Sequence, residues 1–213
     1  MTWGQVKSEN MDAVRHQCMI YEGSSVRHLT GVAYLIAEKI MANMRCLYLT
    51  SPAMVAGLRS YLSAAKVNVA ECVENGSLVL SSGQAHLRNG LFDPDAMLAL
   101  LEETVTQTLR DGYAGLFAVG DMSWEFGPER NFEKLREYEE KLERLFTVYP
   151  QLQGVCQYQV QTLPVQAARE ALRLHRACYI NQTLTLMNPS YGVPAQPDTL
   201  EAMMARPSRL VAS

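Results

Sequence analysis

Polar and aromatic residues stand at the ends of several apolar runs of strand length. Those nearest to such ends are Tyr21, Glu22, Thr50, Ser51, Asp121, Trp124, Cys156 and Tyr158. Two histidines join them, because His16 precedes the first run and His175 ends the last helical pattern. Ligands of open parallel sheets bind beyond the carboxyl ends of the strands, so we expect these side chains to meet. A pocket rich in tyrosine, tryptophan and cysteine is mostly apolar, which favours binding a small organic molecule over catalysis.

The sequence gives only weak evidence for a catalytic arrangement of these residues. A cysteine–histidine nucleophile needs a thiol beside an imidazole and a third group that orients the imidazole. The candidates are Cys18 or Cys156 with His16 or His175. Asp121 and Glu139 could act as an acid and a base, but nothing in the sequence fixes their separation. No G-x-S-x-G nucleophile turn occurs, and we predict a protein that is not an enzyme.

Each candidate also has an ordinary structural role. Trp124 fits a core position or a lid, Asp121 fits the cap of a turn, and Cys156 fits a small buried hydrophobe. Single histidines are most often solvated or hydrogen-bonded within the fold. Tyr21 and Tyr158 need partners for their hydroxyls if they are buried, which a ligand or Glu22 could supply.

The loop after the first strand stands where many α/β proteins bind a phosphate. A P-loop needs several glycines, a lysine for the terminal phosphate and a Ser/Thr for magnesium. The segment YEGSSVRH offers one glycine, Gly23, and no lysine, and no G-x-G-x-x-G occurs in the chain. The following helix N-terminus, with Arg27 beside it, could still attract an anion. The sequence therefore predicts a degenerate P-loop without a nucleotide.

The cysteines predict reduced, buried thiols. The five, an odd count, are Cys18, Cys46, Cys72, Cys156 and Cys178. None forms a C-x-x-C pair, and scattered thiols are typical of a reducing compartment. No two Cys/His pairs have the spacing of a zinc site, so no metal is predicted and the cofactor stays open.

Apolar runs alternate with amphipathic helical patterns along the chain. The expected strands are Gln17–Tyr21, Arg45–Thr50, Ser77–Ser81, Gly115–Gly120 and Gly154–Tyr158. The expected helices are His28–Met44, Pro52–Ala65, Pro94–Arg110, Asn131–Val148 and Pro164–His175. After His175, the alternating segment CYINQTLTL predicts an edge strand or hairpin. This order indicates an α/β fold with a mostly parallel sheet flanked by helices.

Local chemistry supports two of the helices. Asp93 precedes Pro94 as a capping carboxylate before a proline at the first helical position. Asn131 can cap the helix whose polar face carries Glu137 and Lys141 four residues apart. Those charges are expected to form a solvated face and not a binding patch.

Bulk composition limits the class of protein. The chain has 213 residues, 48% hydrophobic and 19% charged, which suits one sizeable core over residues 1–191. A net charge of −3 recruits neither nucleic acid nor an acidic membrane surface. Without a spanning or signal segment, we expect a cytoplasmic location and no membrane contact. The proline-rich tail, residues 192–213, could dock on the domain or form a homodimer.

An ordered series of segments resembles a known family. The segments are HQCMIYEG, RCLYLTS, HLRNGLFDPDAML, GDMSW, LREYEEKLERLF, VCQYQV and a later NPSY. Together they resemble the MEDS domain, the methanogen/methylotroph DcmR sensory domain, over residues 12–192. The resemblance implies a RecA/KaiC-like fold that lacks the phosphate-binding lysine. It also implies a sensory role towards simple hydrocarbon derivatives, such as methyl or halogenated one-carbon compounds, with signalling proteins as partners.

The family's motif positions extend the predicted site. With Cys18 added, the ligand-binding set is His16, Cys18, Tyr21, Glu22, Asp121, Trp124, Tyr138, Glu139, Cys156, Tyr158 and His175. Gln159 and His86 depart from the residues usual in the family. The favoured interpretation is a non-catalytic sensor of a small organic ligand that acts through a regulatory partner protein or self-association. The alternatives are an interaction adaptor without a small ligand, and a cryptic enzyme or nucleotide binder.

Overall fold

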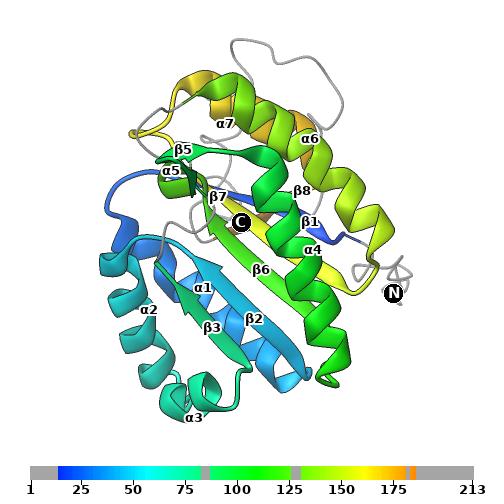
Figure 1. Ribbon diagram of the computed structural model, residues 1–213. Helices are drawn as coiled ribbons and strands as arrows, with labels where there is room; N and C mark the ends of the chain where they lie inside the picture. The colour runs from blue at the N-terminus through cyan, green and yellow to red at the C-terminus, as the bar shows by residue number, and fades with distance from the viewer. Residues whose placement is uncertain (1–13, 83–86, 126–130, 181–182, 186–213) are drawn as a thin grey trace, which may run out of the picture.

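The computed structural model describes residues 14–82, 87–125, 131–180 and 183–185. A seven-stranded sheet runs in the order β3-β2-β6-β7-β1-β8-β9, and only β9 is antiparallel to its neighbour. The strands are β1 (His16–Tyr21), β2 (Met44–Leu49), β3 (Leu78–Ser81), β6 (Gly115–Asp121), β7 (Leu152–Gln159), β8 (Ala177–Ile180) and β9 (Thr183–Thr185). The predicted α/β class with a mostly parallel sheet is confirmed (Figure 1).

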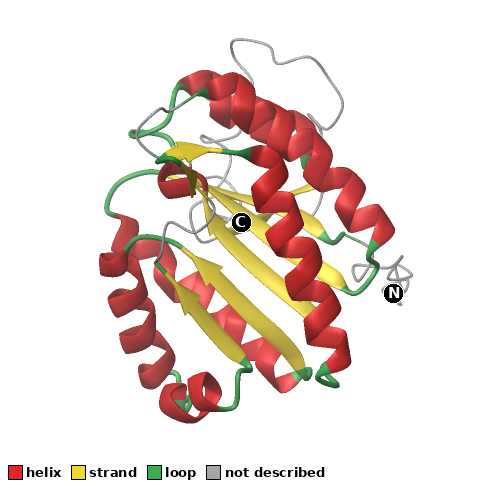
Figure 2. Ribbon diagram, in the orientation of Figure 1, coloured by secondary structure: helices red, strands yellow, loops and turns green. Residues whose placement is uncertain are grey.

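Helices cover both faces of this sheet, as Figure 2 shows. They are α1 (Ser25–Met41), α2 (Pro52–Ala64), α3 (Val69–Glu74), α4 (Pro94–Arg110), α5 (Met122–Glu125), α6 (Phe132–Val148) and α7 (Val165–Leu174). One apolar core joins α1, α2 and α3 to the sheet, and a second joins α4, α6 and α7 to its other face. In Figure 1, α4 and α6 lie in front of the sheet and α1 lies behind it.

Because both faces are covered, the strands are buried on both sides and their residues alternate between the two cores. In β1, Cys18 and Ile20 face α6 and α7, whereas Met19 and Tyr21 face α1 and α2. The register pairs Cys18 with Cys156 of β7. This alternation decides which predicted site residues can meet.

The capping predictions are confirmed. The Asp93 carboxylate accepts hydrogen bonds from the backbone N–H of Asp95 and of Ala96, each at 3.1 Å. Asn131 accepts from the backbone N–H of Lys134 at 3.2 Å, and so caps α6. On the exposed face of α6, Lys141 binds Glu137 at 2.6 Å, as the spacing predicts.

Two local predictions differ from the structure. The first helix spans Ser25–Met41 and not His28–Met44, because Asn43 adopts a left-handed φ of 57° and β2 begins at the next residue. Helix α3 and the small hairpin of β4 (Leu87–Arg88) with β5 (Leu91–Phe92) are additional elements. The predicted strand after His175 is present as β8, paired antiparallel with β9.

All five cysteines are free and buried, as predicted. Within the described ranges, none of the helices combines the length and apolar character needed to cross a membrane. His86 and the tail lie outside the described residues.

Close backbone packing at the start of β6 yields a stability prediction. A Cβ at Gly115 would lie 2.2 Å from the carbonyl oxygen of Gln151, so Gly115→Ala must displace backbone. We expect a loss of roughly 1–3 kcal/mol in unfolding free energy, the usual range for overpacking. Urea unfolding followed by circular dichroism measures the change.

The matched control is Gly31→Ala within α1, where the nearest atom, Met19 Cε, would lie 3.9 Å from the new Cβ. This change should stabilise the protein by about 0.5–1 kcal/mol, because alanine is the better helix former. Equal effects of the two substitutions would contradict the packing argument.

Candidate functional site

Strand alternation divides the predicted pocket into two groups of residues. Cys156 and Tyr158 belong to the core under α4, α6 and α7, whereas Tyr21 belongs to the core under α1 and α2. The sheet lies between the two groups, so no single ligand beyond the strand ends touches all of these side chains. Each group is therefore described separately.

Five buried residues form a compact polar cluster under α6, which we call the buried polar centre. They are His16, Glu139, Cys156, Tyr158 and His175. They come from the start of β1, from α6, from two positions of β7 and from the residue after α7. Every one belongs to the set predicted from the sequence, and none is more than 5% exposed.

His16 lies between two carboxylates of α6. Its Nδ1 is 2.8 Å from Glu143 Oε2, and its Nε2 is 3.2 Å from Glu139 Oε2. Its ring stacks on Phe146, with centroids 4.6 Å apart. Burial alone would lower the pKa of His16, but the hydrogen bonds and charges of the two glutamates outweigh burial and raise it.

Glu139 is the shared partner of the centre. Burial alone would raise the pKa of Glu139, but the charges and hydrogen bonds of His175, His16 and Tyr158 lower it to about 2. Tyr158 donates its hydroxyl to Glu139 Oε1, whereas the histidines face Oε2. Burial, followed by the charge of Glu139, raises the pKa of Tyr158 well above its usual range, which keeps the phenol a donor.

His175 completes the centre from the α7 side. Its Nδ1 is 2.8 Å from the carbonyl oxygen of Ala171, and its Nε2 is 3.6 Å from Glu139 Oε2. Burial lowers the pKa of His175 to about 4, so the ring is neutral at pH 7. The Nδ1–H then donates to Ala171, and Nε2 faces the centre.

The thiol of Cys156 closes the cluster. Its Sγ lies 3.6 Å from His16 Nε2 and 3.6 Å from Glu139 Oε2. Potential ligand atoms of His16, Glu139, Cys156 and His175 all lie within 4.8 Å of one another. This combination of nitrogen, oxygen and sulfur donors can hold a metal ion.

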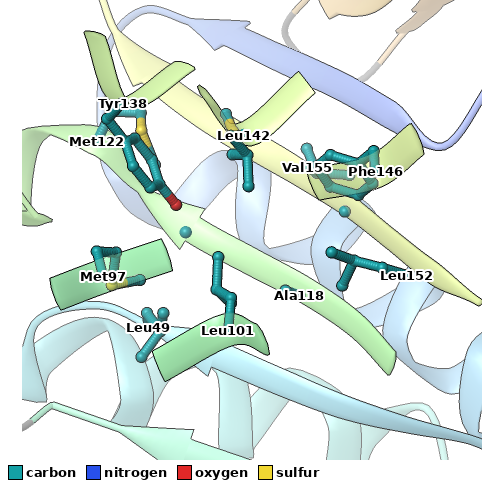
Figure 3. A pocket seen from close by; sticks show the side chains of 13 residues that line it. Leu49, Met97, Leu101, Ala118, Met122, Tyr138, Leu142, Phe146, Leu152 and Val155 are labelled. Carbon is teal, nitrogen blue, oxygen red and sulfur yellow. The ribbon is translucent and has the colours of Figure 1, made fainter. Parts of the chain in front are cut away.

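Two small spaces adjoin the centre. On the inner side, an apolar cavity of about 20 Å³ lies between α4, α6 and the sheet, and Cys156 and Phe146 line it. Figure 3 shows Met122, Tyr138 and Leu142 on one side of this cavity and Met97 and Leu101 on the other. On the outer side, a polar pocket of about 110 Å³ is lined by residues that include Arg15, His16, Glu143 and Arg176.

The second group of predicted residues lies at the strand ends, facing α1 and α2. Asp121 is buried and accepts hydrogen bonds from Thr50 Oγ1 at 3.2 Å and Ser123 Oγ at 2.5 Å. Burial, followed by the Asp121 charge, raises the pKa of Tyr21 and of Tyr48 well above the usual range. Asp121 thus caps the following turn, the structural role considered for it from the sequence.

The loop after β1 is tied to the end of β7. Gly23 has a φ of 81°, and its N–H donates to Gln161 Oε1 at 2.8 Å. Its carbonyl oxygen accepts from Gln159 Nε2 at 3.0 Å. The backbone N–H and C=O of Gly23 are therefore both used in hydrogen bonds within the protein.

The remaining predicted residues fall outside both groups. Tyr138 lines the apolar cavity, and its ring packs edge-on against Phe92. Cys18 is buried next to the centre, and Glu22 is exposed. Trp124 belongs to α5, but its side chain lies outside the described part of the structure.

Sequence reasoning missed two side chains. Glu143 is one helical turn after Glu139, and that i,i+4 spacing was a usable signal that both face His16. His28 of α1 is buried, and its ring stacks on Tyr21 with centroids 3.7 Å apart. Neither ring nitrogen of His28 has a hydrogen-bond partner within the described ranges.

Comparison with known proteins gives one family and a group of similar folds. The family model described as MEDS, methanogen/methylotroph, DcmR sensory domain, matches residues 15–176. Comparison with curated proteins gives no match.

Three similar solved structures come from archaea. An uncharacterized protein, PH0321, from Pyrococcus horikoshii, solved with an unknown peptide, has a TM-score of 0.57 and 16% identity, over 78% of this chain and 76% of that one. The flagellar accessory protein FlaH from Methanocaldococcus jannaschii has a TM-score of 0.54 and 11% identity, over 78% of this chain and 71% of that one. The KaiC-like protein PH0186 from Pyrococcus horikoshii has a TM-score of 0.54 and 13% identity, over the same shares. These similarities show a RecA/KaiC-like fold.

The shared role of Glu139 yields a second prediction. Glu139→Gln removes the charge that pairs with His16, and breaking one partner of a buried ion pair costs about 3–5 kcal/mol. Glu140→Gln, one residue along and 42% exposed, should cost less than about 1 kcal/mol. Urea unfolding of both variants at pH 7 measures the difference, and similar losses would contradict the proposed importance of the centre.

The buried His28 yields a pH prediction. Burial lowers the pKa of His28 to about 4 from an ordinary 6.5, so below pH 6.5 the unfolded chain binds a proton that the folded protein refuses. Stability is therefore lost as the pH falls from 6.5 to 4, by about 3 kcal/mol in total. His28→Phe keeps a ring against Tyr21 and should remove this part of the pH dependence. Urea unfolding of the wild-type protein and of His28→Phe between pH 6.5 and pH 4 measures the difference. The prediction is contradicted if the unfolding free energies of the two proteins fall by the same amount over this range.

Proposed function

The chain belongs to the MEDS family, and from this premise we propose that it is a non-catalytic sensory domain that binds a small ligand and regulates a partner. The observation that carries the proposal is the buried polar centre with an apolar cavity on its inner side. Cys156 belongs to the centre and also lines the cavity, and Phe146 lines the cavity and stacks on His16. A molecule in the cavity therefore touches the groups that hold α6 to the sheet.

The size and lining of the cavity favour a one-carbon derivative. A volume of about 20 Å³ has room for about one water molecule, so even a one-carbon compound must widen the cavity, and a larger ligand must widen it more. Met97 and Met122 line the cavity, and methionine side chains adjust readily to new neighbours. A methyl or halogenated one-carbon compound matches this apolar lining.

Helix α6 is the element that would carry the signal. Glu139 and Glu143 of α6 both bind His16 of β1, while Leu142 and Phe146 of the same helix line the cavity. A ligand that binds better when α6 is displaced shifts the population towards that state. The shift changes the surface that a regulatory partner reads.

The proposal is non-catalytic, and the burial of the candidate nucleophile supports it. Cys156, His16 and Glu143 have the order of nucleophile, base and orienting group. The thiol is buried, however, which disfavours its attack on a substrate that comes from solvent. A nucleotide is also disfavoured, because the Gly23 N–H is bonded to Gln161 and residues 22–28 contain no lysine.

An interaction adaptor without a small ligand is the second candidate. The observation in its favour is a groove of about 450 Å³ between α1 and α2, where Tyr34 and Met41 are 69% and 81% exposed. Large exposed apolar side chains of this kind mark protein-interaction surfaces. An adaptor would leave the cavity without a function.

Titration of the protein with dichloromethane and methanol tests the sensory proposal. With methionine methyl groups labelled for NMR, resonances of Met97 and Met122 should shift, and those of Met54 on the other face should not. Ala118→Val, which adds two methyl groups to the cavity wall, should weaken binding by tenfold or more, about 1.4 kcal/mol. Ala53→Val at the exposed start of α2 should have no effect. Absence of shifts, or equal binding by Ala118→Val, would favour the adaptor.

A further inference from the structure

We infer that the buried polar centre is a site for one divalent metal ion of the Zn²⁺ type, bound by His16, Glu139, Cys156 and His175. The inference deepens the proposed function, because it names an occupant of the same centre. It can be tested separately, because metal binding is measured without any organic ligand. Four buried ligands meet there, from β1, α6, β7 and the connection after α7.

Four of the six distances between ligand atoms are close to the edges of a tetrahedron, and the other two, from His175 Nε2 to His16 and to Cys156, are at most 4.8 Å. With ligand bonds of about 2.0–2.3 Å, a four-coordinate zinc places N and O ligands about 3.3 Å apart, and S about 3.5 Å from N or O. The two histidine Nε2 atoms are 3.2 and 3.6 Å from Glu139 Oε2. Cys156 Sγ is 3.6 Å from both His16 Nε2 and Glu139 Oε2.

The surrounding hydrogen bonds orient each ligand towards one point. His16 Nδ1 faces Glu143, and His175 Nδ1 faces the carbonyl oxygen of Ala171, so both Nε2 atoms face the centre. Tyr158 donates to Oε1 of Glu139, and Oε2 faces the other ligands. Zinc-binding histidines almost always donate their second N–H to a carboxylate or a carbonyl in this way.

Charge balance favours a dication. A Cys156 thiolate and the Glu139 carboxylate carry two negative charges, which a divalent ion neutralises between two neutral imidazoles. Binding releases the thiol proton, together with any proton on His16 Nε2, to solvent. The thiolate also selects a zinc-like ion over Mg²⁺ or Ca²⁺, which prefer oxygen ligands alone.

A route to the surface exists next to His16. The polar pocket of about 110 Å³ is lined by His16 and by Glu143, whose side chain is 38% exposed. An ion in this pocket meets the Glu143 carboxylate first and lies one imidazole ring away from the ligand atoms. Opening the route requires movement of both the Glu143 side chain and the His16 ring.

Cobalt spectroscopy of the full chain tests the inference. Protein stripped with a chelator is titrated with Co²⁺, which should bind 1:1 with a thiolate-to-cobalt charge-transfer band and the strong visible bands of four-coordinate Co²⁺. Zn²⁺ should then displace the cobalt. Absence of both bands in folded wild-type protein would overturn the inference.

Cysteine variants locate the site. Cys156→Ser should abolish the charge-transfer band and weaken Zn²⁺ binding at least 100-fold by calorimetry. Cys46→Ser, an equally buried thiol on the opposite face of the sheet, should retain both signals. Retention of the band by Cys156→Ser, or its loss from folded Cys46→Ser, would overturn the assignment.

A positioning variant covers the case in which Cys156→Ser fails to fold. Glu143→Gln keeps all four ligands but weakens the orienting contact to His16, so it should lower Zn²⁺ affinity by about 10- to 100-fold and keep the cobalt bands. Unchanged affinity would contradict the orienting role and, with it, the ligand geometry.

Repeating the dichloromethane titration on stripped protein separates the two proposals. Ligand-induced methionine shifts without any metal binding would overturn the metal site and leave the sensory proposal standing. Metal binding without ligand-induced methionine shifts would overturn the sensory proposal and leave the metal site standing.

Discussion

A carboxylate of helix α6 buried against the sheet is the constraint on which this face of the structure depends. Glu139 is 1% exposed, yet His16 and Tyr158 hold it as an anion, and His175 Nε2 lies 3.6 Å from its Oε2. A buried charge is tolerated only when its partners are correctly placed. The positions of β1, β7 and the α7–β8 connection relative to α6 are therefore coupled through one side chain, where apolar packing alone would allow small shifts.

The two faces of the sheet have different characters. Facing α1 and α2, the polar groups at the strand ends are bound to one another, as when Asp121 accepts from Thr50 and Ser123. Facing α6, the polar groups converge on a point from β1, α6, β7 and the α7–β8 connection, and they adjoin both an apolar cavity and a polar pocket. The first arrangement stabilises a turn, whereas the second leaves room for an occupant. This difference favours the α6 face as the ligand-binding face over the loop after β1, which binds phosphates in many α/β proteins.

Much of the fold could be predicted from the sequence, because its signals are local. The apolar runs gave the strands, and Asp93 and Asn131 gave two helix starts that the structure confirms. The division of the site was not predictable, because chain order does not reveal that β1 lies between β7 and β8. Once that order is known, alternation sends Tyr21 to one face and Tyr158 to the other. Zinc spacing rules failed to suggest the centre for a related reason, since its ligands lie far apart in the chain and meet only after folding.

Hydrogen exchange of the intact protein, followed by mass spectrometry with and without Zn²⁺ and dichloromethane, tests the central claim most directly. If the buried polar centre is the sensing site, either probe should slow exchange in Phe132–Val148 and His16–Tyr21, and leave Ser25–Met41 and Pro52–Ala64 unchanged. Protection confined to α1 and α2, or no change with either probe, would contradict the account.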